Sequence, residues 1–370
     1  MSTKIHLTVT NDLNYDQRMQ RICRSLAEAG YEVTLVGRQR KHSKPLKDHS
    51  DILRGSFHQK RLKCFFDKGK FFYLEYNLRL LFFLLFQKTD IICGIDLDTI
   101  FPTWLVAKWR KRTFVYDAHE YFTETSSLHG REREKRIWKW VESFIVPKVK
   151  YAYTVNQSIA NIFKTEYGTT FEVIRNVPVL QEPPSKENQK DKYILYQGAL
   201  NKGRGLEFLI SCMPDIDQRL IIAGDGPIRS QLEKMCCELG VEQKVEFLGF
   251  IFPEELKTVT ENAWVGLNLI ENTGLSYYYS LANKFFDYIH ARIPQISMDF
   301  PEYRLLNDQY ECGLLLPDFD KDIFINLIQQ LENEKLYQSF VKNTLVARES
   351  LNWQMESKRL IEFYARIKPI

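Results

Sequence analysis

The sequence predicts an α/β protein made of two doubly wound, Rossmann-like domains. Its 370 residues, 44% of them hydrophobic, are enough for two cores. The first 37 residues run strand, helix, glycine, strand, which is the pattern of a βαβ unit and of a parallel sheet. A polar, Pro-containing segment precedes a second apolar strand near residue 193. We therefore expect a first domain over 1–177, a linker over 178–192, a second domain over 193–351 and a final helix over 352–370.

The composition excludes several classes of protein. A net charge of +4 is too small to indicate nucleic-acid binding. The seven cysteines lack the spacing of metal ligands, so they indicate reduced thiols in a cytoplasmic protein. The chain opens on a short strand-like run rather than a signal peptide, and no apolar run approaches 18 residues. We expect neither secretion nor a membrane-spanning helix.

In the first domain, polar side chains follow the predicted strands at their carboxyl ends, where α/β folds bind ligands. The strand at 5–9 leads to a helix whose Arg18 either lines a ligand site or is solvated. The strand at 112–117 is followed almost at once by His119 and Glu120. A lone histidine is usually structural, so the residues alone leave its role open. A long helix over 131–150 is expected to bury Ile137, Trp138, Val141, Phe144 and Ile145.

The second domain is expected to begin with a phosphate-binding turn. Its first strand, 193–196, runs into Gly198, and a helix is expected from Leu206. Glycine lets the backbone approach a phosphate, and Lys202 or Arg204 adds positive charge. As a bare motif this signal is weak, because many tight turns contain glycines.

The helix between Ser280 and Pro294 completes the predicted site. Asn283 and Lys284 fall at its N-terminal end, where free N–H groups and the helix dipole favour an anion. Asp287 comes one turn later and can accept two hydrogen bonds from a diol. The pattern indicates either a nucleoside-diphosphate site or an ordinary amphipathic helix.

This stretch resembles the donor-site helix of family 4 glycosyltransferases. Residues 282–288, Ala-Asn-Lys-Phe-Phe-Asp-Tyr, match a sub-group of that family, with Asp287 at the second acidic position and Tyr279 at the first. The resemblance implies the GT-B fold, in which two domains face across a cleft and a C-terminal helix crosses back to the first. It also implies a retaining reaction without metal or other cofactor, on a UDP- or GDP-sugar donor.

The resemblance also implies roles for individual residues. His119 would face the donor sugar, and Arg204 with Gly205 would hold the pyrophosphate. Base or sugar contacts are expected from Gly249, Phe250, Leu275 and Ser276. Arg18, Asp96, Asp98 and Glu120 are candidates for the acceptor side. Asp96 and Asp98 superficially fit a DxD metal site, but other ligands are missing, so we expect them to cap a helix starting at Thr99 or to face the acceptor.

The leading function is therefore transfer of a sugar from a nucleotide sugar to a glycan or lipid-linked acceptor, in cell-surface polysaccharide synthesis. Two rivals stay open. A nucleotide-sugar epimerase shares the fold and would use titratable groups to move a proton on the sugar. A non-catalytic sugar-nucleotide-binding subunit is the other, because Tyr279 and Asp287 depart from the usual acidic pair.

A basic stretch indicates where an acceptor could be reached. Eleven Lys or Arg lie between Arg38 and Lys70, and an apolar run follows over 71–86. Either this is a solvated loop followed by a buried core helix, or its cations and aromatic residues dock the protein on an anionic membrane surface beside a lipid-linked acceptor. The second reading places the protein at the inner face of the membrane as a peripheral protein.

Overall fold

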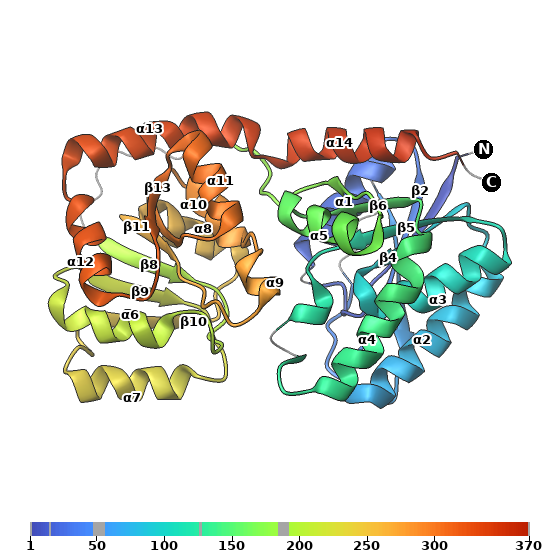
Figure 1. The fold of residues 1–370 in the computed structure, drawn as a ribbon, viewed down its shortest axis with the longest axis horizontal. Coiled ribbons are helices and arrows are strands. Elements are labelled where there is room, and N and C mark those ends of the chain that lie inside the picture. The colour runs from blue at the N-terminus through green and yellow to red at the C-terminus, as the bar shows by residue number, and fades with distance from the viewer. Residues whose placement is uncertain (1, 15, 47–55, 126–127, 184–191, 369–370) are drawn as a thin grey trace. The chain divides into compact units, whose positions relative to one another are not determined.

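The computed structural model describes residues 2–14, 16–46, 56–125, 128–183 and 192–368. They divide into two compact units (Figure 1). Unit 1 consists of Met1–Asn176 with Met355–Ile370, and unit 2 is Val177–Gln354. The C-terminal helix thus belongs to the same unit as the first half of the chain.

Unit 1 is built on a seven-stranded sheet in the order β3-β2-β1-β4-β5-β6-β7, in which every pairing is parallel. The strands are β1 (Lys4–Thr8), β2 (Glu32–Gln39), β3 (His58–Lys63), β4 (Ile91–Ile95), β5 (Thr113–Ala118), β6 (Tyr151–Thr154) and β7 (Glu172–Val173). The helices are α1 (Gln17–Glu28), α2 (Gly69–Phe86), α3 (Asp96–Trp109), α4 (Glu132–Ile145), α5 (Gln157–Tyr167) and α14 (Trp353–Ala365), with short 3₁₀ turns at Phe122–Glu124 and Val146–Lys148.

Helices cover both faces of this sheet. α2 packs against α3, and α3 against α4, so the three form one layer (Figure 1). α1 and α14 lie on the opposite face, where Tyr364 of α14 contacts Tyr31 after α1 and Tyr153 of β6. The register pairs Ile95 of β4 with Asp117 of β5. The residues that follow these two strands therefore meet at one edge of the sheet.

Unit 2 repeats the architecture with six parallel strands in the order β10-β9-β8-β11-β12-β13. The strands are β8 (Tyr193–Gln197), β9 (Arg219–Ala223), β10 (Val245–Gly249), β11 (Val265–Asn268), β12 (Gln295–Met298) and β13 (Gly313–Leu316). The helices are α6 (Leu206–Cys212), α7 (Arg229–Leu239), α8 (Pro253–Asn262), α9 (Leu275–Tyr278), α10 (Asn283–His290), α11 (Pro301–Tyr310), α12 (Lys321–Gln330) and α13 (Glu334–Ser350), with a 3₁₀ turn at Met213–Asp215.

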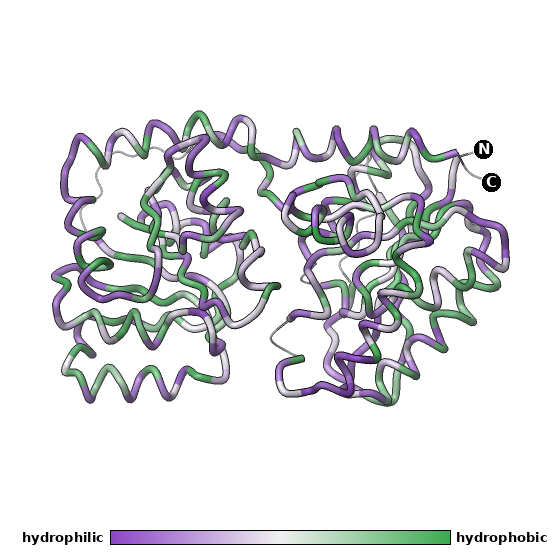
Figure 2. Tube along the Cα trace, viewed as in Figure 1, coloured by the Kyte–Doolittle hydropathy of each residue, from purple (hydrophilic) through white to green (hydrophobic). Residues whose placement is uncertain are grey.

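Most strands of both sheets, unlike the edge strand β3, are largely hydrophobic along their length (Figure 2). Residues such as Ile5, Leu7, Leu195 and Ile222 are fully buried, because strands of a parallel sheet are covered on both faces. The predicted fold class, two Rossmann-like parallel-sheet domains, is thus confirmed.

Several predicted boundaries were wrong for local reasons. α3 begins at Asp96 rather than Thr99, so both carboxylates lie in its first turn. α10 ends at His290, before Pro294, and Arg292 then turns the chain with φ +61°. On α4, Ile137 and Phe144 are exposed instead of buried, because this helix buries Val141, Glu142 and Ile145 against its neighbours.

The basic stretch has more structure than either prediction assumed. Six of its residues form β3, an edge strand with little apolar periodicity. Arg38 is buried over the ring of Phe72. α2 is neither a wholly buried helix nor a wholly exposed one. The loop residues Lys47 and Arg54, like Pro184 to Asp191 of the predicted linker, lie outside the described residues.

None of the helices in the described part of the chain combines the length and apolarity that a membrane crossing requires.

Candidate functional site

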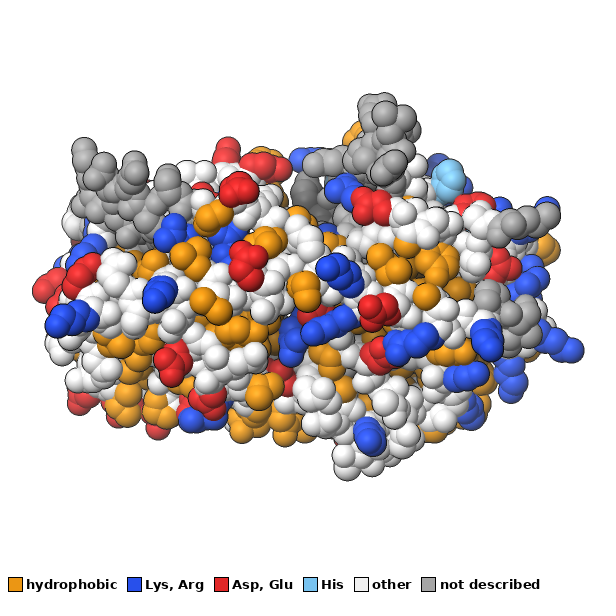
Figure 3. All heavy atoms as spheres, turned by 90° about the horizontal axis from the view of Figure 1, so that it is seen from above, with side chains coloured by type: hydrophobic (Ala, Val, Ile, Leu, Met, Phe, Trp, Pro, Cys, Tyr) orange, Lys and Arg blue, Asp and Glu red, His pale blue; other side chains and the backbone are white. Residues whose placement is uncertain are grey.

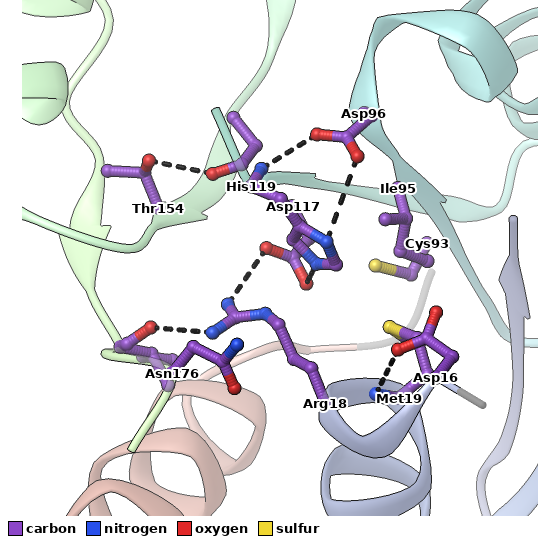
Figure 4. Close-up of polar contacts among 12 residues, drawn as sticks. Asp16, Arg18, Met19, Cys93, Ile95, Asp96, Asp117, His119, Thr154 and Asn176 are labelled. Carbon is purple, nitrogen blue, oxygen red and sulfur yellow. Dashed lines mark hydrogen bonds and ion pairs between the residues drawn. The ribbon is translucent and has the colours of Figure 1, made fainter. Parts of the chain in front are cut away.

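Unit 1 brings four ionisable side chains together at the carboxyl ends of β4 and β5 (Figure 4). We call this group, consisting of Arg18, Asp96, Asp117 and His119, the His119 cluster. Nε2 of His119 lies 2.9 Å from Oδ2 of Asp117, and its Nδ1 lies 3.7 Å from Oδ2 of Asp96. The backbone N–H of His119 donates to Oδ1 of Asp96 at 2.8 Å. The imidazole is thus held between two carboxylates.

Arg18 holds one carboxylate of the cluster in place. Its Nη2 donates to Oδ1 of Asp117 at 3.2 Å, and its Nη1 donates to the carbonyl of Ile174. The side chains of Arg18 and Asp117 are buried, whereas His119 keeps a fifth of its surface exposed. The sequence suggested that Arg18 either lines a ligand site or is solvated. Its buried side chain does neither. It fixes the carboxylate that orients the histidine.

The electrostatics favour a positively charged imidazole. Burial acts to lower the pKa of His119, but Asp117 and Asp96 outweigh it and raise that pKa above its ordinary value. For Asp117, burial acts to raise the pKa, and His119 with Arg18 hold it below the ordinary value. Burial also raises the pKa of Asp96, with Glu120 and Asp98 adding to the effect. The cluster can therefore hold a proton on the ring of His119.

Asp96 has the backbone of a tight turn. Its φ of +53° is left-handed, which Asp tolerates better than most residues. This turn aims its carboxylate at the N–H of His119. Asp98 instead accepts a hydrogen bond from Thr10 at 2.6 Å, and burial raises its pKa to about 6. Glu120 lies exposed beside the cluster.

Metal ligation finds no support here. Among the described residues, no group of three or more His, Cys, Asp or Glu side chains is arranged so that it could hold a metal ion. Asp96 and Asp98 are engaged by different partners, as described above.

Unit 2 carries the other predicted residues, around the turn after β8. Gly198 has φ +133°, and its carbonyl lies so close to Gly224 that a Cβ on Gly224 would be 1.9 Å away. Gly224 in turn pairs with Gly249 at the end of β10. The ends of β8, β9 and β10 thus contact one another through backbone atoms alone. Such a surface lets a phosphate or a base approach closely.

Lys284 points at this turn from the second position of α10. Its Nζ lies 3.7 Å from the ring centroid of Tyr196, and a Cβ on Gly198 would be 3.6 Å from that Nζ. Only 8% of the residue is exposed, and Nζ finds no hydrogen-bond acceptor among the described residues. Burial lowers the pKa of Lys284 well below its ordinary value, Arg204 lowers it further, and Asp287 opposes them.

One aromatic ring packs the helix that presents Lys284 closely against the sheet. Tyr288 packs flat against Gly266, where a Cβ would be 2.4 Å from the ring, and its hydroxyl donates to the carbonyl of Leu267 at 3.1 Å. Any side chain at Gly266 would push α10 away from the sheet.

Asp287 and Arg204 are held nearby. Oδ2 of Asp287 accepts a hydrogen bond from Gln197 at 2.9 Å, and Gln197 in turn accepts one from Thr260. The guanidinium of Arg204 lies 4.9 Å from the ring centroid of Tyr277. Gly198, Arg204, Lys284 and Asp287 therefore form one group, which we call the Lys284 cluster.

The remaining predicted residues of unit 2 are more peripheral. Lys202 and Asn283 are exposed, the first in the glycine turn and the second at the start of α10. Leu275 is exposed and Ser276 buried in α9, next to Tyr277. Phe250 is exposed after Gly249.

Sequence reasoning missed two positioning residues. Asp117 lies near the end of β5, two residues before His119, which follows that strand. That spacing could have identified it. Gln197 is the polar residue that ends an apolar strand, which is the usual location of ligand-site groups in α/β folds.

Comparison with known proteins agrees with this architecture. The sequence model "Glycosyltransferase Family 4" matches residues 17–178, and "Glycosyl transferases group 1" matches residues 180–345. Sucrose-phosphate synthase from Thermosynechococcus elongatus superposes with a TM-score of 0.82 at 17% identity, covering 98% of both chains. Anabaena HepE, solved in complex with UDP-glucose, superposes with a TM-score of 0.76 at 12% identity, covering 98% of this chain and all of that one.

Two curated relatives match over short segments. An uncharacterized glycosyltransferase of Methanocaldococcus jannaschii is 44% identical over 77 residues, a fifth of each chain. The N-acetylgalactosamine-N,N'-diacetylbacillosaminyl-diphospho-undecaprenol 4-alpha-N-acetylgalactosaminyltransferase of Campylobacter jejuni is 40% identical over 63 residues, 16% of this chain and 17% of the relative. The matches therefore span a fifth or less of these relatives.

The two parallel sheets with backbone-lined strand ends give the chain the GT-B fold. The family models, one on each half of the chain, then assign it more narrowly. The chain belongs to the family 4 glycosyltransferases.

Proposed function

We propose that the protein transfers a sugar from a UDP- or GDP-sugar to a glycan or lipid-linked acceptor, in the synthesis of a cell-surface polysaccharide. The observation that carries the proposal is the ammonium of Lys284, which is buried, lacks a hydrogen-bond acceptor among the described residues and faces the turn at Gly198. A buried unpaired cation is costly, so its retention indicates an anionic ligand. A diphosphate supplies that anion.

The other members of the Lys284 cluster are also suited to bind a nucleoside diphosphate. Arg204 adds a second cation, and the start of α10 adds backbone N–H groups. Asp287, fixed by Gln197, accepts hydrogen bonds from the two ribose hydroxyls. The backbone at Gly249 and the side chains of Phe250, Leu275 and Ser276 contact the base or the sugar.

During transfer the bond between the sugar and the diphosphate breaks, and a bond to an acceptor hydroxyl forms. Negative charge grows on the leaving diphosphate. Arg204 and Lys284 stabilise it there, in place of a metal ion, because preorganised cations in a desolvated site act strongly on developing charge. The reaction proceeds with retention, as the family resemblance implies, and we assign no nucleophile.

His119 serves the transferred sugar in this scheme. Its raised pKa keeps a proton on the imidazole, and this proton can be donated to a sugar hydroxyl. Asp117 and Asp96 hold the ring in place, and Arg18 holds Asp117. Asp98 and Glu120 face the acceptor. A lipid-linked acceptor is supported by the Campylobacter relative, whose name contains a diphospho-undecaprenol.

Mass spectrometry of the protein incubated with a panel of UDP- and GDP-sugars tests the proposal. With a suitable acceptor, one donor should release its nucleoside diphosphate and the acceptor should gain the mass of one sugar residue. Conversion of a donor to an isomer of equal mass without any acceptor would show an epimerase instead. Binding of a nucleotide sugar without turnover across the acceptor panel would indicate the non-catalytic subunit.

A further inference from the structure

The outer face of α2 carries an apolar stripe that the rest of the described chain leaves exposed. Five large side chains on this helix are exposed, at three- and four-residue spacing along one side: Phe71, Leu74, Leu78, Phe82 and Phe86. Residues at such spacing form one line on a helix. At 1.5 Å per residue the stripe is about 22 Å long.

Other helices of the same layer also expose large apolar residues, among them Trp109 of α3 and Ile137 and Trp140 of α4. The buried side of α2, made by Phe72, Tyr76, Leu80 and Leu84, already supplies the core contacts of the helix. On the opposite face of the sheet, α14 exposes one large apolar residue, Met355. The side that carries α14, seen from above in Figure 3, has acidic and basic side chains interspersed.

A basic groove runs beside the stripe. It has a volume of about 480 Å³ between the edge strand β3 and α2, and its lining residues are Lys60, Arg61, Leu62, Lys63, Arg79 and Phe82. None of these described lining residues is acidic. Glu75, the nearest carboxylate along α2, is occupied by Arg79 and by the backbone N–H groups of Phe65 and Phe66. Phe82 belongs to both the groove and the stripe.

Arg61, one of the lining residues, has a guanidinium that backbone carbonyls hold in place. Its Nε donates to the carbonyl of Asp12 at 2.8 Å and its Nη1 to the carbonyl of Lys44 at 2.6 Å, which fixes the guanidinium. Its Nη2 has no acceptor among the described residues and carries almost no exposed surface. Lys60 and Lys63 are exposed at the rim.

We propose that the apolar stripe and the basic groove together dock unit 1 on a bilayer containing anionic phospholipids, with a lipid phosphate in the groove. Apolar side chains on one side of a helix beside lysine and arginine are typical of helices that lie in the membrane interface. The cores of protein interfaces, in contrast, are depleted in lysine. Charge complementarity therefore favours the bilayer over a second protein.

Vesicle co-sedimentation tests this docking without donor or acceptor, so its outcome is independent of the proposed transfer reaction. The wild-type protein should sediment with vesicles of phosphatidylcholine and phosphatidylglycerol, not with phosphatidylcholine alone, and added salt should weaken the binding. Each cation near an anionic leaflet strengthens binding about fivefold, so Lys60→Glu with Lys63→Glu should weaken it by about 30-fold or more.

Matched variants test whether vesicle binding depends on this surface rather than on net charge or on loss of folding. Lys335→Glu with Lys342→Glu makes the same charge change on exposed positions of α13 and should bind vesicles like the wild type. Leu78→Ser with Phe82→Ser should lose binding, whereas Val346→Ser, which removes a similarly exposed apolar residue from α13, should not. Thermal unfolding of each variant confirms that it is folded.

Three results would overturn the proposal. The first is a wild-type protein that stays in the supernatant with anionic vesicles. The second is equal loss of binding in the α13 variants. The third is a concentration-dependent dimer in sedimentation velocity that Leu78→Ser with Phe82→Ser abolishes while vesicle binding persists, since the stripe would then serve a second copy of the chain.

Discussion

Replacing Lys284 by methionine should weaken nucleotide binding and at the same time stabilise the empty protein. Methionine keeps an apolar side chain over the ring of Tyr196 and removes only the ammonium. A hydrogen bond to a charged group contributes about 1.5–3 kcal/mol, so the Kd for UDP or GDP should rise by about 10- to 150-fold. The stability effect has the opposite sign, because the ammonium is buried and has no acceptor among the described residues.

The pH dependence of stability isolates the same group. The pKa of Lys284 is lowered in the folded protein, mainly by burial, while the unfolded chain has a value of about 10.4. Between these two values the unfolded state binds more protons, so the free energy of unfolding attributable to Lys284 rises with pH. As the pH rises between these two values, the wild-type protein should therefore gain stability relative to Lys284→Met. Above pH 10.4 the difference should level off.

Two measurements check both effects. Titration calorimetry with UDP and with GDP gives the affinity, and urea unfolding at several pH values gives the stability difference. Lys234→Met, a change at an exposed lysine of α7, is the matched control and should alter neither. A folded Lys284→Met protein with unchanged affinity for both nucleotides would refute the assignment of the diphosphate site.

Five further outcomes are expected. Asp287→Ala should weaken nucleotide binding by about 1.5–3 kcal/mol in calorimetry, since it removes an ionised acceptor for the ribose; unchanged affinity would remove Asp287 from the site. Arg204→Ala should lower kcat by about 10²-fold with a smaller effect on nucleotide affinity. His119→Ala should abolish transfer while nucleotide affinity stays nearly intact. A fully active His119→Ala enzyme would show that the role of His119 is structural. Arg18→Met should lower the free energy of unfolding by about 3–5 kcal/mol, because the buried carboxylate of Asp117 then lacks the guanidinium of Arg18. A loss under about 1 kcal/mol in urea unfolding would contradict this expectation. The raised pKa of His119 adds stability that is fully present below about pH 6.5 and lost as pH rises through the folded-state value, so the stability advantage over His119→Gln should fall across that interval.

The sequence was most informative where one physical signal dominates. The βαβ units were predictable because buried parallel strands are apolar throughout and are followed by glycine or polar turns. The start of α6 at Leu206 and of α10 at Asn283 followed from the glycine turn and from the apolar spacing after Leu281. These signals are local, and the structure preserves them.

The missed features depend on neighbours that are distant in the chain. β3 pairs with β2 through its backbone, so its basic side chains gave no strand pattern. Ile137 and Phe144 are apolar but exposed, and hydrophobic periodicity assigns such residues to the core. The role of Arg18 depends on Asp117, which is 99 residues away. Pairings of this kind come from tertiary structure and not from local spacing.

The membership of α14 in unit 1 has a consequence for the order in which the protein folds during synthesis. Phe363 and Tyr364 pack on Tyr153 of β6, and Glu356 pairs with Arg175, so the last helix completes a core that begins at residue 4. Unit 2 is continuous in sequence, so it needs no segment from elsewhere in the chain to close. The half synthesised first must wait for residues 355–367 to leave the ribosome, with part of one face of its sheet uncovered until then.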